Sequence, residues 1–240
     1  LKIHIKDSMH ILLTRPLEDS TELIIRFQKL GHVVSHMPVI KIEKKNYENL
    51  NFFDYKGIIF TSSNSIKFLD SKKLDKKINC FCVGNATEKQ ALKSGFSNVY
   101  SADGNVANLK ELILQNFNPA DGKLLYVSGE VISSSLDQDL ISEGYNIKRI
   151  INYIARPVEK INDEFIEKLK LKMPEIVFIY SQNSAINFLN IIKNHDLNNL
   201  WKDTNLMCLG EKTSSILNEI KWKKIFLFNP GEEEFLLYKI

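Results

Sequence analysis

Short apolar runs alternate with longer amphipathic stretches along almost the whole chain. Residues 11–13 form such a run, and residues 18–30 then repeat apolar side chains at helical spacing up to Gly31, a typical helix stop. Runs of strand length that alternate with helices predict βαβ units with parallel strands. The same alternation predicts strands at residues 58–61, 80–83, 124–127, 176–180 and 206–209, and helices from residue 64 and at 86–94, 134–143, 183–193 and 213–220. The sequence therefore predicts an α/β fold.

The two halves of the chain resemble each other where the predicted strands end. The segment FTSSNS at residues 60–65 is echoed by IYSQNS at 179–184, and CVGNAT at 82–87 by CLGEKT at 208–213. Turns between strands and helices favour Gly, Ser, Thr and Asn in any protein, so each echo alone is weak. Their shared order in both halves favours duplication, and it predicts two similar α/β domains.

Hydroxyl and amide side chains gather at the predicted starts of these helices. Taken singly, each is typical of helix capping. Taken together, they lie beyond the carboxyl ends of parallel strands, where such folds bind ligands and where free N–H groups favour carboxylate or phosphate. The pattern predicts a cleft that binds an acidic ligand. The residues concerned are Ser62, Ser63, Asn64, Ser181, Asn183 and Ser184.

Charge and cysteine content restrict the class of protein. A net charge of +3 is too small for a dedicated nucleic-acid binder, and no apolar run approaches the ~18 residues of a membrane span. Cys80, Cys82 and Cys208 lie in apolar runs, so we expect buried free thiols and a reducing, cytoplasmic compartment. The histidines are scattered, and no Gly-rich nucleotide motif occurs, so we expect neither a metal nor a cofactor. Residues 1–8, which precede Met9, are interpreted as a vector-derived leader.

Taken in order, these motifs resemble those of the uroporphyrinogen-III synthase family. Each motif is short, and the resemblance depends on their order and spacing across residues 9–240. The motifs are Leu13-Thr14-Arg15-Pro16, FTSSN at residues 60–64, Val83-Gly84-x-x-Thr87, residues 125–129, the Tyr153 segment and Leu209-Gly210-x-x-Thr213.

The resemblance implies two flavodoxin-like domains joined by a two-stranded linker, with the active-site cleft between them. The chain is expected to cross between the domains at residues 37–43, beginning around Pro38, and again at residues 151–157. Two such linkers in a monomer would act as a hinge. The expected domains are residues 9–38 with 156–240, and residues 42–152.

The resemblance also implies a lyase that cyclises hydroxymethylbilane to uroporphyrinogen III, with loss of water and inversion of ring D, in tetrapyrrole (haem) biosynthesis. Tyr153 matches the family tyrosine that points into the cleft, and we interpret it as the general acid. Transient contact with the preceding enzyme of the pathway is a further expectation. The substrate is an octacarboxylate, and its expected contacts are Arg15, Thr61, Ser62, Ser63, Asn64, Gly84, Thr87, Ser128, Gly129, Ser181, Gly210 and Thr213.

Four residues depart from the family pattern. Tyr180 stands where a smaller residue is usual, Ser128 where an arginine is common, and Glu88 where a small residue is usual, while Glu211 adds a negative charge to an anion site. These departures weaken the site assignment more than the family assignment.

Other interpretations of two residues and of the function remain open. Tyr153 is also explained as a packing residue of the linker, and Arg15 as a structural arginine at a strand end. The alternative function is a two-domain protein that binds an acidic metabolite without turnover, and a weaker one is a scaffold that passes the bilane between enzymes.

Overall fold

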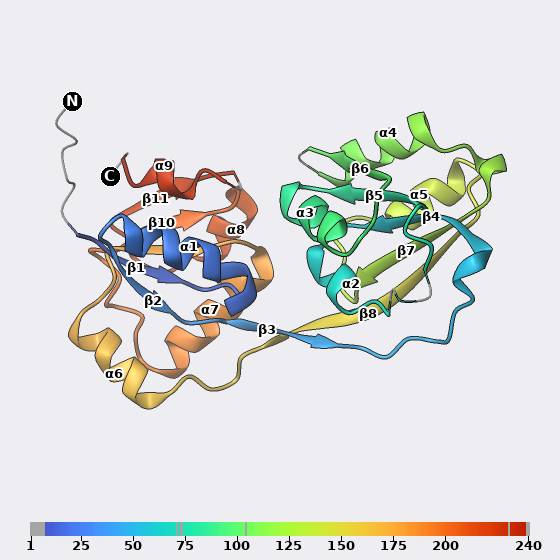
Figure 1. Ribbon diagram of the computed structural model, residues 1–240. Coiled ribbons are helices and arrows are strands. Elements are labelled where there is room, and N and C mark those ends of the chain that lie inside the picture. Colours follow the sequence, from blue (N-terminus) through green and yellow to red (C-terminus); the bar gives the residue numbers. More distant parts are fainter. Residues whose placement is uncertain (1–7, 71, 73, 104, 230, 239–240) are drawn as a thin grey trace, which may run out of the picture. The chain divides into compact units, whose positions relative to one another are not determined.

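The computed structural model describes residues 8–70, 72, 74–103, 105–229 and 231–238. Except for Ser8, the expected leader lies outside these residues. The described chain packs into two compact units (Figure 1). Unit 1 contains the described residues up to Lys41 together with those from Arg156 onward, and unit 2 contains residues 42–155.

In the described residues, unit 1 is built on a five-stranded parallel sheet in the order β11-β10-β9-β1-β2. Successive residues of a strand point to opposite faces. Leu12 and Val177 therefore pack towards α7, while Ile11 and Phe178 pack towards α1. The strands are β1 (His10–Leu13), β2 (Val33–His36), β9 (Ile176–Ile179), β10 (Asn205–Cys208) and β11 (Lys224–Leu227). The helices are α1 (Leu17–Lys29), α6 (Asp163–Leu171), α7 (Gln182–Asn194), α8 (Glu211–Ile216) and α9 (Glu233–Leu236).

Unit 2 repeats this plan in its described residues, with a six-stranded sheet in the order β3-β8-β7-β4-β5-β6. Phe60 and Val127 pack on the face that carries α2 and α3, and Ile59 and Tyr126 on the face of α4 and α5. The strands are β3 (Ile40–Lys44), β4 (Tyr55–Phe60), β5 (Asn79–Val83), β6 (Val99–Ala102), β7 (Lys123–Gly129) and β8 (Ile147–Pro157). The helices are α2 (Ser63–Lys67), α3 (Asn85–Lys93), α4 (Val106–Asn116) and α5 (Leu136–Ser142), with 3-10 helices η1 (Phe52–Asp54) and η3 (Pro119–Asp121). The predicted α/β class with parallel sheets is confirmed.

The two segments through which the chain passes between the units run side by side. The Val158 N–H donates to the Val39 carbonyl at 3.0 Å, and the Lys45 N–H donates to the Asn152 carbonyl at 2.9 Å. The residue number rises from 39 to 45 in the first segment while that of its partner falls from 158 to 152, so the two segments are antiparallel. The two segments contain β3 and β8, which pair at the edge of the six-stranded sheet. The other strand pairs of that sheet are parallel.

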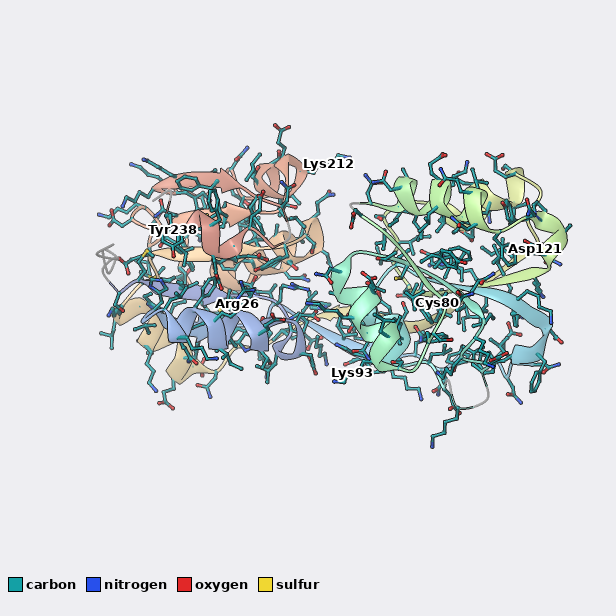
Figure 2. The ribbon with its side chains drawn as sticks, turned by 45° about the horizontal axis from the view of Figure 1, so that its top comes forward. Arg26, Cys80, Lys93, Asp121, Lys212 and Tyr238 are labelled. Carbon is teal, nitrogen blue, oxygen red and sulfur yellow. The ribbon has the colours of Figure 1, made fainter. Side chains whose placement is uncertain are left out.

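The prediction of buried free thiols is also confirmed. Cys80 and Cys82 lie in β5 and Cys208 lies in β10, all as free thiols. Figure 2 labels Cys80 inside unit 2. Burial raises the pKa of Cys82 to about 11 and that of Cys208 to about 12. These thiols therefore stay protonated at neutral pH and serve as core residues. No helix in the described part of the chain combines the length and hydrophobicity needed to cross a bilayer.

Gly57 gives the first testable prediction, which concerns stability. A Cβ on Gly57 would lie 2.5 Å from Leu124 Cδ2 and 3.3 Å from Phe117 Cε2, inside the core of unit 2. We expect Gly57→Ala to lower the free energy of unfolding by about 1–3 kcal/mol, because overpacking a dense core forces side chains out of their rotamers. Urea denaturation measures this loss, and Lys56→Ala, at an exposed neighbour on the same strand, is the control. An unchanged midpoint for Gly57→Ala would contradict the packing described here.

His10 gives a second prediction, on the pH dependence of stability. Burial, and next the charge of Lys172, lower the pKa of His10, although Glu175 opposes them. The residue is 7% exposed, and its Nε2 lies 2.7 Å from Ser35 Oγ. The unfolded chain therefore binds a proton near pH 6.5 that the folded chain does not, so this contribution is complete above about pH 6.5 and declines as the pH falls below it.

The measurement is urea denaturation between pH 7.5 and 5.5. The slope that His10 adds cannot exceed the one-proton limit of about 1.4 kcal/mol per pH unit. We expect His10→Gln to flatten the decline in the free energy of unfolding relative to the unsubstituted protein. Parallel pH profiles for the two proteins would show that His10 titrates alike in the folded and unfolded chain.

Candidate functional site

In unit 2, the residues singled out in the sequence follow strands that lie next to one another. Residues 61–64 follow β4, Gly84 follows β5 and Gly129 ends β7. β4 pairs in parallel with both β5 and β7, and β7 pairs in parallel with β8, which carries Tyr153. Parallel pairing brings these carboxyl ends to one edge of the sheet, where open α/β sheets bind ligands.

A hollow of about 400 Å³ opens at this edge, within unit 2. Thr61, Ser62, Gly129 and Tyr153, all expected from the sequence, line it. Its remaining lining residues were not among the substrate contacts expected from the sequence. These are Val83, Asn105, Val106, Tyr126, Val131, Ile132 and Ser133.

Tyr153 lies directly against Gly129. The ladder between β7 and β8 pairs Ser128 with Ile151 and Gly129 with Tyr153, so Asn152 is an extra residue in β8. A Cβ built on Gly129 would lie 2.6 Å from Cζ of Tyr153 and 2.8 Å from its hydroxyl. Only glycine leaves room for the phenol at this place, and the irregular register delivers the half-buried ring there.

A second phenol lines the hollow beside Thr61. The Tyr126 hydroxyl lies 3.2 Å from Thr61 Oγ1, and its side chain is buried. Burial raises the pKa of Tyr126, although the hydrogen bond to Thr61 and the charge of Arg149 oppose this. The phenol is therefore neutral at physiological pH. Sequence analysis missed it because it lies inside an apolar run that reads only as a core strand.

Two helix starts also border the hollow. Ser62 caps α2, where its Oγ accepts from the Asn64 N–H at 3.2 Å. Asn105 caps α4 and accepts from the N–H groups of Ala107 and Asn108, at 2.9 and 3.1 Å. The start of α4 adds a partial positive charge to the hollow, which favours carboxylates.

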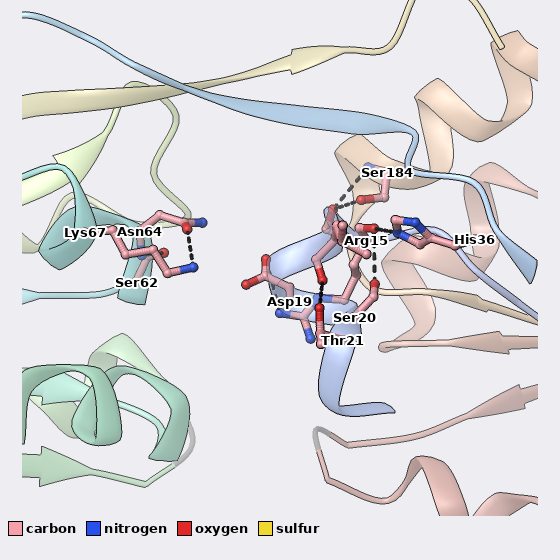
Figure 3. Close-up of polar contacts among 11 residues, drawn as sticks. Arg15, Asp19, Ser20, Thr21, His36, Ser62, Asn64, Lys67 and Ser184 are labelled. Atoms are coloured by element: carbon pink, nitrogen blue, oxygen red, sulfur yellow. Dashed lines mark hydrogen bonds and ion pairs between the residues drawn. The ribbon is translucent and has the colours of Figure 1, made fainter. Parts of the chain in front are cut away.

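Other residues predicted to bind substrate in unit 2 lie outside the lining of the hollow. Asn64 Oδ1 accepts from Lys67 Nζ at 3.3 Å (Figure 3), Ser63 is the first residue of α2, and Gly84 caps α3 with a positive φ of 79°. Thr87 is buried, with 4% of its surface exposed. Ser63, Asn64 and Gly84 are thus partly exposed residues of the turns at this edge, whereas Thr87 is part of the interior.

Ser128, which we expected to contact substrate, is not among the residues that line the hollow. Its side chain is fully buried, with Oγ donating to the Gly129 carbonyl at 3.0 Å and accepting from Arg149 Nε at 2.8 Å. A hydroxyl held in this way does not reach the hollow. Its place at the end of β7 is the one at which the resemblance led us to expect an arginine, and here an arginine from β8 contacts it.

In unit 1, the predicted residues lie at the corresponding edge. Ser181 follows β9 and caps α7, with Oγ accepting from the Ser184 N–H at 3.1 Å and donating to Ser184 Oγ at 2.9 Å. Gly210 follows β10 and caps α8 with a φ of 82°, and Thr213 is only 3% exposed. The side chain of Thr213 is therefore part of the interior of unit 1.

Arg15, which follows β1, is held by its neighbours (Figure 3). Its guanidinium lies 3.6 Å from Asp19 Oδ2 and 4.7 Å from the centre of the Tyr180 ring. Its carbonyl lies 2.7 Å from His36 Nε2. Tyr180, which departs from the family pattern, thus makes a cation–π contact with Arg15. This geometry supports the structural interpretation of Arg15 more than the substrate-binding one.

No group of three or more His, Cys, Asp or Glu side chains among the described residues is arranged to hold a metal ion. The hollow of unit 2 is lined by two phenols, by hydroxyl side chains and by backbone at two helix starts. These groups donate hydrogen bonds without carrying a charge.

Comparison of the sequence and the structure with known proteins finds one family throughout. A family model described as uroporphyrinogen-III synthase HemD matches residues 21–227. Uroporphyrinogen-III synthetase from Helicobacter pylori has a similar structure, with a TM-score of 0.61 and 17% identity, covering 97% of this chain and 100% of that one. A mutant uroporphyrinogen III synthase from the extremely thermophilic bacterium Thermus thermophilus gives a TM-score of 0.50 and 13% identity, covering 97% and 98%. No curated protein matches the sequence.

Proposed function

This chain belongs to the uroporphyrinogen-III synthase family and is an enzyme of haem biosynthesis that acts on a tetrapyrrole; we propose that Tyr153, in the hollow of unit 2, is its general acid. The proposed substrate is hydroxymethylbilane and the product uroporphyrinogen III. The observation that carries the role of Tyr153 is its phenol lying over Gly129 in the hollow.

The proposed reaction is a lyase reaction in which water leaves and a ring closes. Tyr153 donates its proton to the hydroxymethyl group on ring A, and the departing water leaves an electrophilic azafulvene. Ring D attacks through its already substituted α-carbon. The resulting spiro intermediate fragments and recloses with ring D inverted, and loss of a proton restores the aromatic pyrrole.

The protein contributes mainly geometry to this sequence. Hydroxymethylbilane closes without help to the wrong isomer, so the enzyme must favour one transition state over another. A neutral phenol suits the acid role, because it donates a proton and adds no positive charge beside the azafulvene cation. Holding that phenol on a strand against a glycine fixes its position better than a loop would.

Neutral donors would hold the acetate and propionate arms of the substrate. Thr61, together with Asn105 and Val106 at the start of α4, lines the same hollow as Tyr153. Donors of this kind bind carboxylates in a protein whose net charge is only +3. In unit 1, we propose that the turns at Ser181 and Gly210 provide similar contacts.

The test adds purified protein to freshly generated hydroxymethylbilane, oxidises the products and separates isomers I and III. We expect isomer III to dominate, at a rate above the control without protein. Isomer I alone, formed at the spontaneous rate, would contradict turnover and leave a protein that binds an acidic metabolite.

A further inference from the structure

Arg149 is not among the residues that line the hollow, but it contacts three successive residues where β7 ends, the last two residues of the strand and the residue that follows it. It lies on β8, is half-buried, and donates from Nε to Ser128 Oγ at 2.8 Å. Its Nη2 donates to the carbonyls of Gly129 and Glu130, at 2.9 and 3.1 Å. The end of β7 is therefore held by one side chain from the neighbouring strand.

These contacts lie at the place where the regular ladder is interrupted. The extra residue in β8 shifts the register between Ser128 and Gly129. One backbone bond crosses beyond the shift, from the Glu130 N–H to the Tyr153 carbonyl at 3.0 Å. A bulge disturbs ladder pairing, and carbonyls near it need other donors. The guanidinium supplies those donors to Gly129 and Glu130.

Arginine is suited to this position by its shape. Its planar guanidinium presents several N–H groups in a fixed fork, whereas the ammonium of lysine is a compact point charge on a flexible stem. The guanidinium of Arg149 also lies 6.0 Å from the centre of the Tyr126 ring, which lines the hollow. Arg149 thus contacts the end of β7 and one of the two phenols.

We infer that Arg149 is a positioning residue for catalysis, which fixes the end of β7 so that Gly129 keeps the Tyr153 phenol in place. This inference rests on the proposed role of Tyr153. Arg149 does not line the hollow, so it is not proposed to touch substrate. Its effect passes through the Ser128–Glu130 segment to Gly129, and from Gly129 to the ring that lies against it.

The test is a double-mutant cycle between Arg149→Lys and Tyr153→Phe, with kcat, KM and the isomer ratio measured for hydroxymethylbilane. We expect Arg149→Lys to lower kcat about tenfold and to raise the share of isomer I. The reason is that the Tyr153 phenol would be held less firmly in its reactive orientation, which slows the catalysed reaction. In the Tyr153→Phe background, the same substitution is expected to change kcat by less than about twofold, since a residue that acts through Tyr153 loses its effect once the phenol is gone.

Ser128→Ala is the second variant, because it removes only one of the three acceptors. It is expected to lower kcat in the same direction by a smaller factor, with the same loss of effect in the Tyr153→Phe background. Lys148→Met is the control, since Lys148 is the neighbour of Arg149 in the sequence and pairs with Glu48 at 2.6 Å. It is expected to keep the kcat of the unsubstituted protein. Thermal midpoints of all variants are measured alongside.

The outcomes separate this inference from the proposed function. An unchanged kcat for Arg149→Lys, or an equal fold-loss in both backgrounds, would overturn the positioning role while isomer III is still formed. If Arg149→Lys lowers only the thermal midpoint, the residue is structural and the inference is wrong. If the unsubstituted protein forms no isomer III, the proposed function itself fails.

Discussion

Replacing Gly129 with alanine is expected to lower the turnover of hydroxymethylbilane about a hundredfold, because a catalytic group misplaced by about 1 Å loses a factor of this size. The added Cβ would lie 2.6–2.8 Å from three atoms at the far end of the Tyr153 ring. The end of a side chain gives way more readily than backbone does, so the phenol moves. The measurement is kcat with hydroxymethylbilane, together with the midpoint of urea denaturation.

Gly57→Ala is the matched control for this prediction. It makes the same change in the same sheet, but its Cβ would meet core side chains that do not line the hollow. We expect Gly57→Ala to lose stability and keep turnover, and Gly129→Ala to lose turnover and keep most of its stability. If both variants lose stability alone, the contact between Gly129 and Tyr153 has no catalytic consequence.

Most of the interior elements of the fold were predictable from the sequence. Apolar runs of four or five residues followed by helical periodicity located strands such as β4, β7 and β9 to within a few residues. The strands at the sheet edges, β2, β6 and β11, were missed. They are four residues long and partly exposed, and β2 and β6 contain no more than two apolar residues in succession. β11 does contain an apolar run, residues 225–228, which the sequence analysis did not assign to a strand. The helices α4 and α6 were also not predicted, and α4 directly follows the missed strand β6.

The candidate site was predictable where its residues stand at the end of a strand. Thr61, Ser62 and Gly129 belong to turn motifs, and they meet at the hollow. Tyr126 and Arg149 carried no such signal. They face each other only because β7 and β8 pair in one register, and single-sequence patterns do not determine the register between strands. Contacts that depend on register are therefore seen only in the structure.

Tyr153→Phe is expected to slow turnover about a hundredfold, the lower end of what a general acid contributes. Affinity for the product should stay nearly intact, because the ring remains against Gly129 and only the hydroxyl is lost. The spontaneous reaction then competes, so the share of isomer I should rise. The measurements are kcat, the isomer ratio after oxidation, and the Kd of uroporphyrinogen III.

Tyr145→Phe shows what the same change does at a structural tyrosine. The Tyr145 hydroxyl donates to the Phe117 carbonyl at 2.6 Å in the core of unit 2. Losing this buried bond should lower the free energy of unfolding by about 1 kcal/mol and leave turnover unchanged. If Tyr153→Phe behaves as Tyr145→Phe does, Tyr153 is a packing residue and the proton comes from another donor in the hollow. The neutral Tyr126 phenol, hydrogen-bonded to Thr61, would then be the next residue to substitute.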